Sequence, residues 1–410
     1  MSDANDDEDG GAARDHEHSE VVELTRALVS VPVADAESAA GDRIEAWLRE
    51  HAPGAVLRDD HGNVFARRTP GDSSETGDSE DLSDAGDVTG GDRATLALVG
   101  HHDVVDPADS QVDDDGTMTV AVDEDAAAEG VRVRGRGTAD MKGAVAAAML
   151  AFRDADLGSS ETRSRDLVFA SFVGEEVGGE GCRAAIADGF APTWAVVGEG
   201  STGYSAPGVT DVAIAHKGRR AVTVEATGAA AHASEPEAGE NAIYRATDAV
   251  DGLRDLAWPT VDVAGERLAG SVVVTEVDGG SAWNVVPDRC EVTVDERTVP
   301  GERADVERVE DVPGVSVRVD QDLPPMRCRD DAFAAAVLAA ADAVQDGTPE
   351  RVSKPHATDA GWLDDRAGAA CVVCGAAEPG EAHTDAESAS VAVLERCRRL
   401  YERLAASSLD

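Results

Sequence analysis

The chain has 410 residues, and its 82 acidic side chains against 36 basic ones give a formal net charge of −46. Nucleic acids and anionic membranes are polyanions that bind clustered lysine and arginine, so this charge excludes both as default partners. Apolar residues make up 42% of the chain, enough for a sizeable buried core, and the length predicts two or three domains.

The composition also suggests the surroundings in which the protein works. Aromatic residues make up 3% of the chain, and only three of its basic residues are lysines. A strongly acidic, lysine-poor protein stays hydrated and soluble at multimolar salt, where the screening length shrinks to about 3 Å. We therefore interpret the protein as halophilic.

The N-terminal segment has neither the basic nor the apolar part of a signal peptide, and no apolar run reaches the roughly 18 residues of a membrane span. We therefore expect a cytoplasmic protein with reduced cysteines. The pair Cys371 and Cys374 lies in an apolar strand, where residues three apart point to opposite faces, so we interpret both as core residues.

In chain order, residues 1–19 are expected to be a disordered acidic tail, and residues 70–92 an acidic surface loop. Helices are predicted near 20–30 and 37–51. The remaining elements alternate, with strands at 94–100, 167–173, 194–198 and 370–375 and helices at 139–154, 332–344 and 386–406. This alternation indicates an α/β domain with a mostly parallel sheet, which we assign to 20–209 and 322–410.

Between residues 210 and 321 the pattern changes to strands that alternate apolar and polar residues. The order is strand, helix, strand, strand, helix, strand, which is the ferredoxin-like βαββαβ arrangement. Its segments are 220–228, 239–253, 271–279, 290–298, 304–312 and 315–321. We therefore predict a second domain, residues 210–321, inserted into the first.

Candidate metal ligands follow the predicted parallel strands. Ligands of α/β sheets bind at the carboxyl ends of the strands, and the residues found there are His101, Glu175, Glu176, Glu199 and His383. Imidazoles and carboxylates without thiolates suit zinc or a similar divalent ion. Any single carboxylate can fall there by chance in so acidic a chain, but the whole chain has only ten histidines.

Neighbouring residues extend this pattern. Asp103, two residues after His101, could fix the tautomer of a metal-binding imidazole. Asp140 lies in a Gly-rich turn before a helix, where it is either a ligand or an ordinary helix cap. Glu175 and Glu176 are adjacent and point differently, so one can bind metal while the other acts as a base.

Seven motifs resemble the M20 metallopeptidase family, which includes acetylornithine deacetylase, succinyl-diaminopimelate desuccinylase, aminoacylase and glutamate carboxypeptidase. They are GHHDVV (100–105), GRGTADMKG (135–143), GEEVGGEG (174–181), VVGEGST (196–202), GAAAHAS (228–234), NVVPDRCEVTVDERTVPG (284–301) and EPGEAHTDAE (378–387). The resemblance spans about residues 20–406. It implies a catalytic domain with two metal ions and an inserted lid that mediates homodimerisation.

The resemblance also assigns roles to individual residues. Five ligands would hold the two metal ions: His101 and Glu199 for one ion, Glu176 and His383 for the other, and Asp140 bridging both. Zinc is the expected metal, and cobalt or manganese suits the same ligands. Asp103 would orient His101, and Glu175 would be the general base.

Three lid residues would act on the substrate. His232 would reach the active site of the neighbouring subunit and help hold the oxyanion, Arg297 would bind the substrate carboxylate, and Asn284 would lie near the substrate. Each has a plainer alternative, namely a surface histidine, a strand salt bridge and a turn residue. A further segment resembles a pocket-lining stretch of the family through His356, Thr358 and Asp359.

The chain departs from the family between DVV and GRG, where deacetylase and desuccinylase members carry a tryptophan and a Pro-Phe pair that are missing here. The acyl group therefore stays open. In the family, Glu at the position of Glu199 accompanies enzymes that act on acylated amino acids or C-terminal residues. The resemblance thus implies a hydrolase that cleaves the amide bond of a small N-acylated amino acid. The alternatives are an M20 carboxypeptidase or dipeptidase and, outside enzymes, a non-catalytic metal-binding scaffold.

Overall fold

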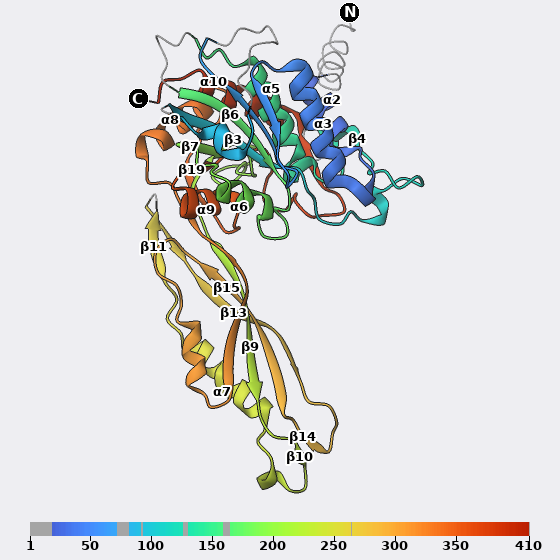
Figure 1. Cartoon of the computed structure of the whole chain (residues 1–410), viewed down its shortest axis with the longest axis vertical. Coiled ribbons are helices and arrows are strands. Elements are labelled where there is room, and N and C mark those ends of the chain that lie inside the picture. Colours follow the sequence, from blue (N-terminus) through green and yellow to red (C-terminus); the bar gives the residue numbers. More distant parts are fainter. Residues whose placement is uncertain are drawn as a thin grey trace, which may run out of the picture. The chain divides into compact units, whose positions relative to one another are not determined.

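The computed structural model describes residues 19–409, apart from 72–81, 92, 126–129, 159–164 and 264. The predicted acidic tail and the middle of the predicted acidic loop thus lie outside the described residues. The chain forms two compact units (Figure 1). One runs to Ile214 and continues with Arg327–Val352 and from Thr358 onward, and the other comprises Ala215–Met326 and Ser353–Ala357.

The first unit is built on a sheet with the strand order β1-β2-β6-β3-β7-β19-β8-β17, in which β18 also pairs with β8. The bounds are β1 Ala55–Arg58, β2 Val64–Arg68, β3 Ala94–His101, β6 Arg165–Phe172, β7 Trp194–Val197, β8 Val212–His216, β17 Met326–Arg327, β18 Arg351–Lys354 and β19 Ala370–Val373. The four central strands β6, β3, β7 and β19 are parallel, whereas β1, β2 and β8 pair antiparallel. The predicted mostly parallel sheet is thereby confirmed.

Helices cover this sheet. Their bounds are α2 Glu20–Val29, α3 Ala36–His51, α4 Ala85–Thr89, α5 Gly143–Asp154, α6 Glu180–Ala187, α8 Asp331–Asp342, α9 Asp359–Trp362 and α10 Val391–Ala405. Helix α5 is buried on every side from Gly143 to Phe152 because it packs against β3 and β6 as well as α2 and α10 (Figure 1). Within the described residues, no helix is long and apolar enough to span a bilayer.

Three expectations about this unit are corrected. The predicted loop 70–92 contains helix α4, because Ala85 and Val88 are buried. Helix α5 begins at Gly143 and not near 139, because Asp140 and Met141 have non-helical backbone angles. Helix α10 begins at Val391 and not near 386, because Ser388–Ser390 form strand β20, which pairs with β5, Gly130–Arg134; β4, Ala121–Asp125, completes this small sheet.

The second unit has the predicted ferredoxin-like order. Its antiparallel sheet runs β13-β15-β9-β16, with bounds β9 Gly218–Thr227, β13 Ser271–Gly279, β15 Arg289–Thr298 and β16 Val315–Leu323. Helix α7, Ala242–Arg254, packs on one face of this sheet, against a core that includes Val222, Val224, Val292 and Val294 (Figure 1). The predicted helix at 304–312 is instead a 3₁₀ turn, Val306–Asp311.

Short hairpins complete the second unit. Strand β10, Ala231–His232, pairs with β14, Val285–Val286, and β11, Thr260–Val263, pairs with β12, Glu266–Ala269.

Candidate metal centre

The carboxyl ends of the parallel strands bring the predicted ligands to one edge of the sheet. His101 is the last residue of β3, Glu175 and Glu176 follow β6 in a tight turn, and Glu199 follows β7. His383 comes from the loop after β19 and has a φ of 62°. Among the described residues it is the only non-glycine residue with a positive φ. Parallel pairing therefore explains how His101, the two glutamates after β6 and Glu199 meet, and the loop after β19 adds His383.

Asp140 lies between the two histidines. Its Oδ1 is 3.1 Å from His101 Nε2, and its Oδ2 is 3.0 Å from His383 Nε2. Each imidazole nitrogen faces a second carboxylate, with Glu199 Oε1 3.3 Å from His101 Nε2 and Glu176 Oε1 2.9 Å from His383 Nε2. The structure thus places the five predicted ligands as two groups that share one aspartate.

These separations fit metal ligands. Zinc bonds of about 2.0–2.2 Å in a tetrahedral site hold two ligand atoms about 3.3–3.6 Å apart. The four nitrogen–oxygen separations lie between 2.9 and 3.3 Å, so shifts of a few tenths of an ångström would admit an ion. The donor chemistry and the spacing therefore both suit a pair of divalent cations.

Carboxylates outnumber imidazoles here, and the pKa values reflect this. Hydrogen bonds with Asp140 and Glu176 raise the pKa of His383 to about 10. Burial opposes a charge on His101, yet its three carboxylate neighbours raise its pKa well above the usual value. The carboxylates of the cluster therefore favour positive charge on the two imidazoles. Bound metal ions would supply that positive charge in place of the protons on His101 and His383.

Asp103 and Glu175 lie beside the ligands. Asp103 Oδ1 is 3.2 Å from the second ring nitrogen of His101, and its Oδ2 accepts a hydrogen bond from the backbone N–H of Glu176 at 3.0 Å. A Glu175 oxygen lies within 4.8 Å of ligand atoms of His101 and Glu199. Burial raises the pKa of Glu175 well above its usual value, with Glu199 and neighbouring acids adding to the effect. By distance alone, Glu175 suits either a base or a ligand.

The structure adds weight to Asp359, which the sequence indicated only through a loose resemblance. Asp359 is 2% exposed at the start of α9, and its Oδ1 makes no hydrogen bond within the described residues. Its pKa is raised to about 7, chiefly by burial, with the carboxylates of Asp103 and Glu199 adding to the effect and His101 opposing it. Asp359 thus belongs electrostatically to the centre. His356 lies in the other unit, where it is exposed.

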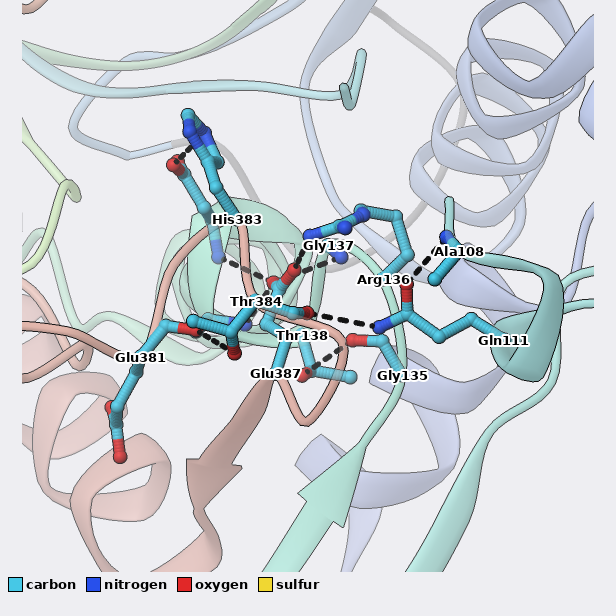
Figure 2. A network of polar contacts seen from close by, with 12 residues as sticks. Ala108, Gln111, Gly135, Arg136, Gly137, Thr138, Glu381, His383, Thr384 and Glu387 are labelled. Atoms are coloured by element: carbon cyan, nitrogen blue, oxygen red, sulfur yellow. Dashed lines mark hydrogen bonds and ion pairs between the residues drawn. The ribbon is translucent and has the colours of Figure 1, made fainter. Parts of the chain in front are cut away.

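Sequence reasoning assigned no role to Glu387. Figure 2 shows Glu387 beside Gly137 in the turn that precedes α5. Its Oε1 accepts backbone hydrogen bonds from Gly137, Ala139 and Asp140. Its other oxygen accepts a hydrogen bond from Arg136 at 2.6 Å. The one available signal was its position at the end of the motif that contains His383.

The lid residues divide into two places within the second unit. His232 is exposed in β10, and its Nδ1 lies 2.7 Å from Ser234 Oγ. The backbone N–H of Ala233, which follows His232, donates to the carbonyl of Asn284 at 2.9 Å. Arg297 lies elsewhere, on β15, where it donates to both oxygens of Asp295 at 2.7 and 3.2 Å. The structure thus brings His232 and Asn284 together but not Arg297.

The distance between the two places follows from the register. Arg297 pairs with Arg219 at the start of β9, whereas His232 follows the end of β9 at Thr227. At about 3.3 Å per residue, the strand between Arg219 and Thr227 spans roughly 26 Å.

Comparisons with known proteins identify the family. Residues 97–407 match the model of peptidase family M20/M25/M40. An acetylornithine deacetylase of Myxococcus xanthus is 30% identical over 78% of this chain and 81% of its own length. A putative succinyl-diaminopimelate desuccinylase of Mycobacterium tuberculosis is 26% identical over 73% and 75%. A probable carboxypeptidase of Emericella nidulans is 28% identical over 69% and 63%.

Solved structures share the fold. Aminopeptidase PepT from Bacillus cereus superposes with a TM-score of 0.68 at 19% identity, covering 94% of this chain and 97% of its own. A dinuclear metal-binding M20 peptidase from Bacillus subtilis has a TM-score of 0.60 at 16% identity, covering 94% and 96%. Since the family model spans most of the chain and a group of candidate metal ligands lies within that span, the chain belongs to peptidase family M20/M25/M40 and is a metallohydrolase.

Proposed function

We propose that the protein hydrolyses the amide bond of an N-acylated amino acid, in the manner of acetylornithine deacetylase or succinyl-diaminopimelate desuccinylase, with two divalent ions, zinc in the first place. The observation that carries this proposal is Asp140, whose two oxygens face His101 and His383 at 3.1 and 3.0 Å. The two relatives named for this chemistry support the substrate class.

Each side chain has a task in this reaction. When bound, the ions would lower the pKa of a shared water and polarise the scissile carbonyl. Glu175 takes a proton from the attacking water and returns it to the leaving amine. Asp103 orients the imidazole of His101. His232 donates a hydrogen bond to the developing oxyanion, and Arg297 holds the substrate carboxylate with two parallel hydrogen bonds.

The lid geometry supports a homodimer. Arg297 pairs with Arg219 near the start of β9, and His232 follows the end of β9 at Thr227. The strand between Arg219 and Thr227 rises roughly 26 Å, which is longer than a small acyl amino acid. One lid therefore cannot offer both residues to one substrate. We infer that His232 and its neighbour Asn284 serve the active site of a second copy of the chain. Arg297 of the same lid then binds substrate in a different active site from the one that His232 serves.

The six cysteines are free and buried, in agreement with the cytoplasmic location that we propose.

A substrate panel tests the proposal. Purified protein at high salt would be assayed with N-acetylornithine, N-succinyl-diaminopimelate, dipeptides and a matched N-acetyl amino acid amide that lacks the free carboxylate. We expect hydrolysis of an N-acyl amino acid and at least about tenfold weaker kcat/KM for the matched amide, since a hydrogen-bonded charge is worth about 1.5–3 kcal/mol. Preferential cleavage of dipeptides would favour the carboxypeptidase or dipeptidase alternative, which a fungal relative's name also suggests.

A further inference from the structure

Glu387 joins the two segments that carry Asp140 and His383. It lies four residues after His383 and immediately before β20, which pairs antiparallel with β5. Strand β5 in turn ends at Arg134 and leads directly into the turn 135–140. A displacement of Glu387 would therefore move the segments of Asp140 and His383 together.

The carboxylate of Glu387 fills a nest of backbone N–H groups. Its Oε1 accepts from Gly137 at 2.9 Å, Ala139 at 3.0 Å and Asp140 at 3.2 Å. Glu387 is 1% exposed, and a buried carboxylate is tolerated only when hydrogen bonds replace its water. These N–H groups lie at the start of a helical turn, where no helical carbonyl precedes them, so they depend on this acceptor.

Further hydrogen bonds tie Glu387 to the His383 segment (Figure 2). The N–H of Glu387 donates to the Thr384 carbonyl at 3.2 Å, and its own carbonyl accepts from Gly135 at 3.0 Å. Gln111 Nε2 also donates to the Thr384 carbonyl at 3.2 Å. One residue thus fixes the turn before Asp140 and the loop after His383 to each other.

We infer that Glu387 is a positioning residue for the metal pair. By holding the turn of Asp140 and the loop of His383 at one spacing, it presets the distance between the two metal subsites. This inference rests on the two-metal site of the proposed function and does not depend on the substrate class. Groups that orient metal ligands typically contribute 10- to 100-fold in metal affinity, so a loss of about this size is expected without Glu387.

Glu387→Gln is the most direct test, because glutamine has one acceptor oxygen in place of two. Either the backbone N–H groups or Arg136 then lose their acceptor. A matched control is Glu296→Gln, since Glu296 is also 1% exposed, accepts from Arg220 at 2.8 Å and from the Ala304 N–H at 3.2 Å, and lies in the other unit.

Chelator-treated full-length protein would be titrated calorimetrically with Zn²⁺ at high salt, and the melting temperature would be measured in parallel. We expect Glu387→Gln to bind at least one ion about 10- to 100-fold more weakly than wild type, whereas Glu296→Gln loses stability but keeps both affinities. Wild-type affinity for both ions in Glu387→Gln would overturn the inference.

If Glu387→Gln does not fold, Glu387→Asp replaces it, because it keeps the charge but is one methylene too short to reach all three N–H groups. Wild-type affinities in that variant would equally overturn the inference. Fewer than two ions bound by the wild type would overturn the two-metal site and this inference with it. A negative substrate panel would count against the substrate class alone.

Discussion

Glu175 and Glu176 are neighbours in one turn, yet their surroundings differ. Glu176 Oε1 lies 2.9 Å from His383, while Glu175 is half-buried near the carboxylates of Glu199 and Asp359. A carboxyl among other carboxylates holds its proton more tightly. We propose that this turn places a metal ligand, Glu176, and a base, Glu175, on either side of one peptide bond.

Exchanging each glutamate for glutamine tests this division. Glu175→Gln is expected to lower kcat by about 10²- to 10⁴-fold, because the proton acceptor is lost, while metal content stays near that of the wild type. Glu176→Gln is the matched control and is expected to lose an ion. Metal analysis of both purified variants decides the matter, since loss of an ion in Glu175→Gln alone would show that the roles are reversed.

The candidate metal ligands, which the structure brings together, could be named from the sequence because each follows a recognisable apolar strand or lies in a motif of the family. Glu387 could not, since it acts through backbone N–H groups of Gly137 and Ala139 that no spacing pattern reveals. The place of Arg297 was also hidden, because its partner Asp295 and its distance from His232 follow from strand register.

Among the elements, the turn 135–140 departs most from what the sequence indicates. Apolar spacing predicted a helix from 139. The hydrogen bond of the Asp140 N–H to Glu387 favours the non-helical backbone at Asp140, and the regular helix begins only at Gly143. The predicted helix at 386–406 is present but begins later, at Val391, because Ser388–Ser390 pair with β5 before it. In both places a long-range contact overrides local propensity, whereas the strands and the ferredoxin-like order were predictable because burial alone fixes them.

Gly137 tests the importance of this turn. Its φ is 86°, and a Cβ there would lie 2.7 Å from Val104 Cγ1, so Gly137→Ala adds a clash to backbone strain. Gly116 is the matched control, with a φ of 83° and no atom within 4 Å of the place that a Cβ would take. Gly116→Ala is expected to cost about 1–2 kcal/mol of unfolding free energy, and Gly137→Ala more, with weaker metal binding. Equal stability losses in denaturant unfolding and equal metal affinities would contradict this role of the turn.

At the scale of the whole molecule, the net charge of −46 dominates. Dilute buffer extends the screening length to about 30 Å at 0.01 M, against about 3 Å at 1 M. Carboxylates that are independent in strong salt then repel each other across the fold, and the repulsion favours expansion.

We therefore expect the protein to lose activity and native circular dichroism on dialysis into 10 mM buffer, and to regain stability as salt is added. A thermal unfolding series in increasing KCl measures this dependence. Full activity after prolonged dialysis at low salt would contradict the halophilic interpretation.

Assembly is the second property at this scale. If His232 acts on a partner's site, a His232→Ala chain and a Glu175→Ala chain are each inactive alone, but a mixed dimer has one site with both defects and one with neither. Random pairing of equal amounts gives about half mixed dimers and about one quarter of wild-type activity per chain. Mixed dimers confirmed by differential tags but without recovered activity would show that His232 does not act in trans.

The central claim is that two ions, held by His101, Asp140 and His383 with Glu176 and Glu199, make this chain a hydrolase. The most direct test removes metal with a chelator and adds Zn²⁺ stepwise while hydrolysis of an N-acyl amino acid is followed. The account predicts that activity is absent without metal and stops rising at about two ions per chain. Full activity in protein that contains no metal by elemental analysis would contradict it.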